Sequence, residues 1–66
     1  MSSDDYIAVI EGKHEKCTVE HRFTGGGLIE RVGIFPSMKE AMIAAATYMR
    51  EADYPIEYGI HFFPLK

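Results

Sequence analysis

The chain has 66 residues, a formal net charge of −3 and one cysteine. This length supports one domain with a marginal core, a single cysteine excludes an internal disulfide framework, and no run approaches the roughly 20 apolar residues that a membrane span needs. The seven basic residues are scattered, so the basic footprint that nucleic-acid binding requires is missing. We therefore expect one soluble, cytoplasmic domain over residues 1–66, with residues 1–5 flexible.

Two strands are predicted in the first third of the chain. Residues 6–12 place apolar side chains on both sides of an alternating pattern, which is typical of a strand in the interior of a sheet. After a polar turn, residues 17–23 alternate strictly and predict a strand with one face in water. The residues that share one side of this second strand are Cys17, Val19, His21 and Phe23.

Three consecutive glycines, Gly25–Gly27, follow the second strand. A Walker loop needs a Gly-Lys-Ser/Thr ending that runs into a helix, and a dinucleotide fingerprint needs G-x-G-x-x-G at the start of a helix. This run leads instead into a third predicted strand, over residues 28–35. Because glycine adopts positive φ without steric cost, the run predicts the tight turn of a hairpin rather than a phosphate-binding loop.

The hydrophobic period changes to three and four residues after Pro36. Ser37 and Glu40 form a capping box and Pro55 ends the pattern, so we expect a helix from the cap at Ser37 to about Tyr54. Its apolar stripe consists of Met38, Ala41, Met42, Ala45, Tyr48, Met49 and Ala52.

A fourth strand is predicted over residues 56–65, which completes the order β-β-β-α-β. The first three strands should form an antiparallel meander, and the helix then carries the chain across one face before the last strand returns to the sheet. A right-handed crossover sets that strand parallel to the first or the third strand, and we favour a place beside the first. The sequence thus predicts a two-layer α+β domain.

One helix covers only one face of such a sheet, and the other face is predicted to be apolar. In the third strand, Leu28, Val32 and Ile34 align on one side while Ile29 and Phe35 take the other. The uncovered face would carry some of Tyr6, Ala8, Ile10, Ile29, Phe35, His61 and Phe63. A patch of this kind marks an interface, unless the register is off by one residue or the termini fold over the sheet.

Six residues are candidates for partner binding. Three of them belong to the expected uncovered face: Tyr6, His61 and Phe63. The other three, on the outer face of the helix, are Ile43, Arg50 and Tyr54. These three either form an aromatic and arginine anchor of the kind that dominates binding energies, or Ile43 is a scattered exposed apolar residue.

Three other chemistries fit the residues less well. His14, Cys17 and His21 have zinc-like spacing, but four strand residues separate Cys17 from His21 by about 13 Å, so we expect a buried Cys17 and a surface His21. No spacing selects a nucleophile with a base, so we expect no enzyme, catalytic residue, cofactor or metal site. The run GIHFFP is similar to the aromatic strand of RNA-recognition domains but lacks the basic residues of that motif.

The opening DYIAVIEG and the strand-to-helix order resemble the HicB-type antitoxins, small degraded RNase-H-like domains that bind and silence a toxin. The Phe-Pro-Asp and Pro-Gly-Cys segments of that family have no counterpart in this sequence. Small acidic chains without catalytic motifs are also typical of phage-encoded inhibitors such as anti-CRISPR proteins.

The leading prediction is a non-catalytic protein-binding module, an inhibitor or regulator of a larger protein. It would act through the uncovered sheet face or an edge strand, in a homodimer or with another partner. The alternatives are a small metal- or ligand-binding domain that uses its histidines and cysteine, and a nucleic-acid-binding module.

Overall fold

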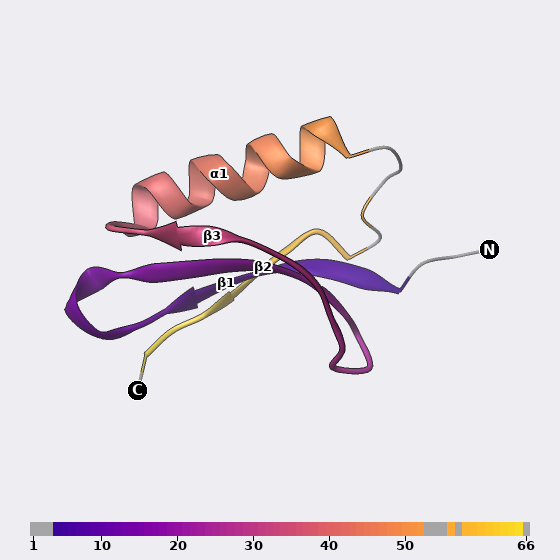
Figure 1. The fold of residues 1–66 in the computed structure, drawn as a ribbon, viewed down its shortest axis with the longest axis horizontal. Helices are drawn as coiled ribbons and strands as arrows, with labels where there is room; N and C mark the ends of the chain where they lie inside the picture. Colours follow the sequence, from indigo (N-terminus) through magenta and orange to yellow (C-terminus); the bar gives the residue numbers. More distant parts are fainter. Residues whose placement is uncertain (1–3, 53–55, 57, 66) are drawn as a thin grey trace.

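The computed structural model describes residues 4–52, 56 and 58–65. In chain order the elements are β1 (Asp5–Glu11), the 3-10 turn η1 (Lys13–Glu15), β2 (Cys17–Phe23), β3 (Leu28–Phe35), α1 (Met38–Glu51) and β4 (Ile60–Phe63). Figure 1 shows α1 lying along one face of the sheet, and no element of the described residues packs on the opposite face. The predicted two-layer α+β architecture is confirmed.

The sheet has the strand order β3-β2-β1-β4. β1 pairs with β2 and β2 with β3 in antiparallel orientation, whereas β4 runs parallel to β1, with Ile60 opposite Ile7. The last strand therefore returns beside the first, as the sequence predicts. β1 is an interior strand, which explains why it carries apolar residues on both of its sides.

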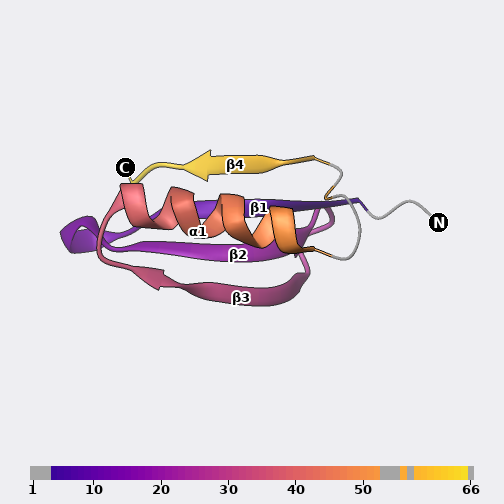
Figure 2. The same ribbon diagram turned by 90° about the horizontal axis from the view of Figure 1, so that it is seen from above.

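The hydrophobic core lies between α1 and the centre of the sheet. Ile7, Val9 and Val19 are fully buried and meet Ala41 and Ala45 of the helix. Because alanine has a single side-chain carbon, these two positions let the helix backbone approach the two central strands closely. Figure 2 shows α1 above β1 and β2, with β4 along one edge of the sheet.

β3 departs from regular alternation, because its pairing with β2 shifts register at two places. A shift of one residue moves the following side chains to the opposite face. Val32 and Phe35 pack against the core, whereas Ile34 is 59% exposed. The predicted grouping of Val32 with Ile34 is therefore wrong. Phe35, one of the residues from which the uncovered face was expected to be formed, lies opposite the buried Cys17 and faces the core instead. A Cβ on Gly33 would lie 3.0 Å from the Phe35 ring, so glycine leaves room for this side chain.

The glycine run forms the hairpin turn between β2 and β3, as predicted. The N–H of Phe23 donates to the carbonyl of Gly27 at 2.8 Å, and the N–H of Gly26 donates back to Phe23 at 2.9 Å. Gly26 has φ +106°, a region that L side chains rarely adopt. The side chain of Arg22 also donates to the carbonyl of Gly26 at 2.6 Å, so the tip of the turn is held by the preceding strand.

The ends of α1 are set by local signals. The side chain of Ser37 accepts the N–H of Glu40 at 3.3 Å, which confirms the predicted cap. The helix ends at Glu51, and Ala52 is extended with φ −66° and ψ 146°. This end comes earlier than the predicted end near Tyr54, which lies outside the described residues.

β4 is shorter than the predicted strand over residues 56–65. Gly59 adopts φ +71° after a turn at Tyr58, so regular pairing with β1 begins only at Ile60. Ile56 nevertheless reaches the core. In the described ranges, the one α-helix lacks the length and hydropathy that a membrane crossing requires.

Candidate interaction surface

The face of the sheet opposite α1 is organised in three rows that cross the strands in the order β3, β2, β1, β4. The pairing register places the first row at Ile34, Thr18, Ile10 and Phe63. The second row consists of Arg31, Glu20, Ala8 and His61. The third row consists of Leu28, Arg22 and Tyr6. We call these residues the open face; its aromatic side chains lie on β1 and β4, and its charged side chains lie on β2 and β3.

An aromatic group forms the β1 and β4 half of the open face. The ring of Tyr6 meets His61 edge-on, with centroids 5.3 Å apart and planes at 72°, and lies 6.3 Å from the tilted ring of Phe63. His61 Nε2 is held by a 3.0 Å hydrogen bond to the carbonyl of Tyr58. Phe63 is 43% exposed. Three of the six predicted partner-binding residues thus lie together on one surface.

Two shallow hollows flank the pair of Tyr6 and Phe63. The smaller one, about 220 Å³, is lined by Tyr6, Thr24, Tyr58, His61 and Phe63. The larger one, about 310 Å³, is lined by Tyr6, Ala8, Ile10, Arg22 and Phe63. Ligand pockets measure about 300–1,000 Å³, so the smaller hollow lies below this range and the larger one at its lower limit. Both are open and shallow, which suits single side chains of a partner.

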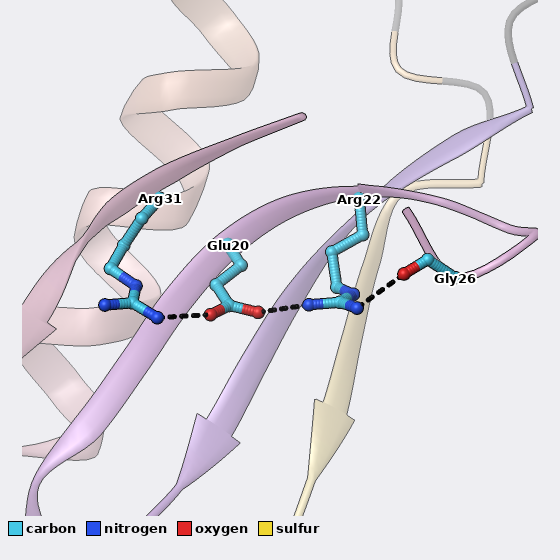
Figure 3. Close-up of polar contacts among 4 residues, drawn as sticks. All are labelled: Glu20, Arg22, Gly26 and Arg31. Carbon is cyan, nitrogen blue, oxygen red and sulfur yellow. Dashed lines mark hydrogen bonds and ion pairs between the residues drawn. The ribbon is translucent and has the colours of Figure 1, made fainter. Parts of the chain in front are cut away.

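Three charged residues lie on the β2 and β3 half of the open face (Figure 3), which also carries Thr18, Leu28 and Ile34. Glu20 is buried and accepts from both neighbours: Arg22 donates to Oε1 at 2.7 Å and Arg31 donates to Oε2 at 3.4 Å. The hydrogen bond to Glu20 raises the pKa of the Arg22 guanidinium above its ordinary value. Two arginines against one glutamate give the open face a net charge of +1, which leaves −4 for the rest of the chain of net charge −3.

A second polar group lies on the other face of the sheet, beneath α1. Oδ2 of the fully buried Asp5 is 2.6 Å from Nε2 of His21, which is 3% exposed. Nδ1 of His21 forms a 2.9 Å hydrogen bond with the hydroxyl of Tyr48, and this hydroxyl donates to Glu30 at 3.0 Å. The rings of His21 and Tyr48 also meet edge-on at 5.3 Å. These contacts connect β1, β2, α1 and β3.

This group corrects two predictions. Asp5 opens β1 and is buried, so the predicted flexibility of residues 1–5 is wrong for Asp5; residues 1–3 lie outside the described ranges. The predicted surface position of His21 is also wrong, because the imidazole lies between Asp5 and Tyr48. One sequence signal pointed to burial: His21 shares a strand side with Cys17 and Val19, and a polar side chain on a buried side needs a partner.

The three residues with zinc-like spacing, His14, Cys17 and His21, do not form a site in the structure. His14 is exposed on η1, Cys17 is buried with its thiol 3.7 Å from the carbonyl of Glu15, and both ring nitrogens of His21 are hydrogen-bonded. Within the described ranges, no group of three or more His, Cys, Asp or Glu residues is placed to hold a metal ion.

The remaining candidates lie on the helix. Ile43 is 57% exposed and Arg50 is exposed in the last turn of α1, while Tyr54 lies outside the described residues. Because α1 packs on the face of the sheet opposite the open face, Ile43 and Arg50 belong to a different surface from Tyr6, His61 and Phe63. The six candidates therefore do not form one site.

No protein-family model, no curated protein and no solved structure matches this chain. The fold defines its class: a small α+β domain in which a four-stranded mixed sheet of order β3-β2-β1-β4 carries one helix. The similarity to HicB-type antitoxins consists of one segment and the order of the elements.

Proposed function

We propose that this protein is a non-catalytic protein-binding module, an inhibitor or regulator of a larger protein, and that the open face is its binding surface. The observation that carries this proposal is the aromatic group of the half-buried Tyr6 and the exposed His61 and Phe63 on a sheet face over which no described element packs. Aromatic side chains with arginines nearby are the residues that most often dominate binding energy at protein interfaces. An exposed apolar patch on a small domain is itself a mark of an interaction site.

The backbone beneath the open face supports the same function. The aromatic residues lie on or next to paired strands, His61 is oriented by Tyr58, and Arg22 connects Glu20 to the hairpin turn. A surface whose side chains are already held in place loses less conformational entropy when a partner binds. The two hollows beside Tyr6 and Phe63 provide recesses for protruding side chains of the partner.

The test compares three variants in affinity capture from the native host's lysate, followed by mass spectrometry. Phe63→Asp and Tyr6→Asp are expected to abolish capture of the proteins that wild type retains, because each places a carboxylate in the aromatic group. Ile43→Asp, on the exposed face of α1, is the matched control and is expected to retain them. Circular dichroism of each variant must match wild type.

Loss of capture with Ile43→Asp but not with Phe63→Asp would move the binding surface to the helix and contradict the proposal. Capture that survives all three substitutions would contradict it as well.

A further inference from the structure

We propose that the open face binds an extended segment of a partner protein that carries an apolar side chain and, about three residues away, an acidic one. This inference rests on the proposed function and adds the chemistry of the partner. Two observations carry it: the largely apolar hollow beside Tyr6 and Phe63, and the exposed guanidinium of Arg31 on the other side of the open face.

The apolar half offers a recess for one side chain. The larger hollow is lined by Tyr6, Ala8 and Ile10 of β1, Phe63 of β4 and Arg22 of β2. Ala8 is buried beneath its neighbours, whereas Tyr6 and Ile10 are half-buried and Phe63 is exposed. These three side chains provide the accessible apolar surface of the hollow. An aliphatic or aromatic side chain placed there removes apolar area from water on both partners, which favours binding.

The cationic half offers a receptor for one carboxylate. In the described part of the chain, Glu20 is the only partner of the Arg31 guanidinium, and Arg31 remains 58% exposed. Both oxygens of Glu20 already accept from arginines, whereas Arg31 has five N–H donors and uses one of them. The planar guanidinium therefore retains donors for a second carboxylate, which it can bind with two parallel hydrogen bonds.

Charge and register select the segment further. The open face has a net charge of +1 on a chain of net charge −3, so an acidic segment is attracted to this face and repelled by the rest of the molecule. Ala8, Glu20 and Arg31 lie directly opposite one another on β1, β2 and β3. Two strand spacings of about 4.8 Å place Arg31 about 10 Å from Ala8. Three residues of an extended segment in the polyproline-II conformation span about 9 Å and return the side chain to the same side of the segment.

The small net charge of the open face argues against a nucleic acid as the occupant. Both arginines of the open face share the carboxylate of Glu20. A nucleic-acid ligand draws its affinity from several neutralised phosphates, and this face would neutralise few.

The experiment selects peptides from a random library displayed on phage against the wild-type protein. Enriched peptides are expected to place Asp or Glu two to four residues from an aliphatic or aromatic residue. For synthetic copies, fluorescence anisotropy should show that Arg31→Gln weakens binding about tenfold, since a charge-assisted contact is lost, and that Arg31→Lys weakens it less. Lys39→Gln, on the exposed part of α1, is the matched control and should leave the affinity unchanged.

A double substitution isolates the contact itself. A peptide whose acidic residue is changed to its amide should bind wild type about tenfold more weakly and should lose nothing more with Arg31→Gln, because the two changes remove the same contact. Additive losses would overturn the inference, since Arg31 and the acidic residue would then act independently.

The remaining outcomes separate this inference from the proposed function. Peptides that lose affinity with Phe63→Ala but not with Arg31→Gln, or that lack an acidic residue, overturn the inference and leave the open face as a binding surface. Peptides that are insensitive to both substitutions overturn the inference and the proposed function together. No enrichment, a doubled mass by light scattering, or binding of a single-stranded RNA probe that Arg31→Gln abolishes would each overturn the inference.

Discussion

Asp5 and His21 depend on each other because both are buried. A carboxyl group taken out of water costs several kcal/mol unless a partner compensates for the lost hydration, and Nε2 of His21 lies 2.6 Å from Oδ2 of Asp5. The imidazole is in turn held by Tyr48 of α1. The side chain of His21 thus links the start of β1 to the packing of the helix, although neither His21 nor Asp5 lies on the open face.

We expect His21→Ala to lower the free energy of unfolding by about 2–4 kcal/mol, because it leaves the buried carboxyl of Asp5 without its imidazole partner. Urea denaturation measures this change. His14→Ala, at an exposed histidine, is the control and should change stability by less than about 0.5 kcal/mol.

A double variant tests the cause of that loss. Asp5→Asn combined with His21→Ala should cost less than the sum of the two single losses, because both changes remove the same contact between the two side chains. Additive losses would show that the two side chains act independently.

The hairpin and the helix show how single elements are specified by local chemistry. Gly26 adopts, at little energetic cost, a backbone conformation that other residues rarely adopt. Arg22 of β2 donates a hydrogen bond to the carbonyl of Gly26. Ser37 completes the first turn of α1 by accepting an N–H that the helix leaves without a partner. In both elements, a few neighbouring residues are sufficient to specify the local structure.

We expect Gly26→Ala to destabilise the protein by about 1–2 kcal/mol, since its φ of +106° is strained for a residue with a Cβ. Gly25→Ala is the matched control, because a Cβ there meets no atom within 4 Å and no positive φ is required. Equal denaturation midpoints for the two variants would contradict the assigned role of Gly26.

Ser37→Ala should lower the free energy of unfolding by about 1 kcal/mol through loss of the helix cap. Ser37→Asp should retain most of the stability, because a carboxylate oxygen accepts the same N–H. Thermal unfolding monitored by circular dichroism at 222 nm distinguishes the two variants, and similar losses for both would argue against a capping role.

The whole molecule presents two sheet faces of different kinds. One face is covered over its central strands by α1, whose alanines bring the helix close to them. The other face carries aromatic rings and a cationic pair, with a charge opposite in sign to that of the rest of the chain. An asymmetric partner therefore fits this face better than a second copy, which would bring two faces of like charge together.

We accordingly expect the isolated protein to remain a monomer of 7.5 kDa across about a hundredfold range of concentration, with a melting temperature that does not depend on concentration. Light scattering and thermal unfolding measure the two quantities. A mass or melting temperature that rises with concentration would indicate self-association, and Phe63→Asp would then show whether the open face mediates it.

Features that depend on neighbouring residues were predictable. The alternation over residues 17–23, the glycine turn and the cap at Ser37 are each patterns within a few neighbouring residues. The element order and the two-layer architecture therefore followed from the sequence alone. The place of β4 beside β1 also followed, because a strand that is apolar on both sides belongs in the interior of a sheet.

The tertiary structure decided the features that join distant residues. The register shifts between β2 and β3 placed Val32 on the core side and Arg31 opposite Glu20 on the open face. The pair of Asp5 and His21, 16 positions apart, likewise exists only once β1 and β2 are in register. The sequence by itself determined the elements, because their signals are local. Which side chains share the open face was decided only by strand pairing, because one shift in register moves every following side chain to the opposite face.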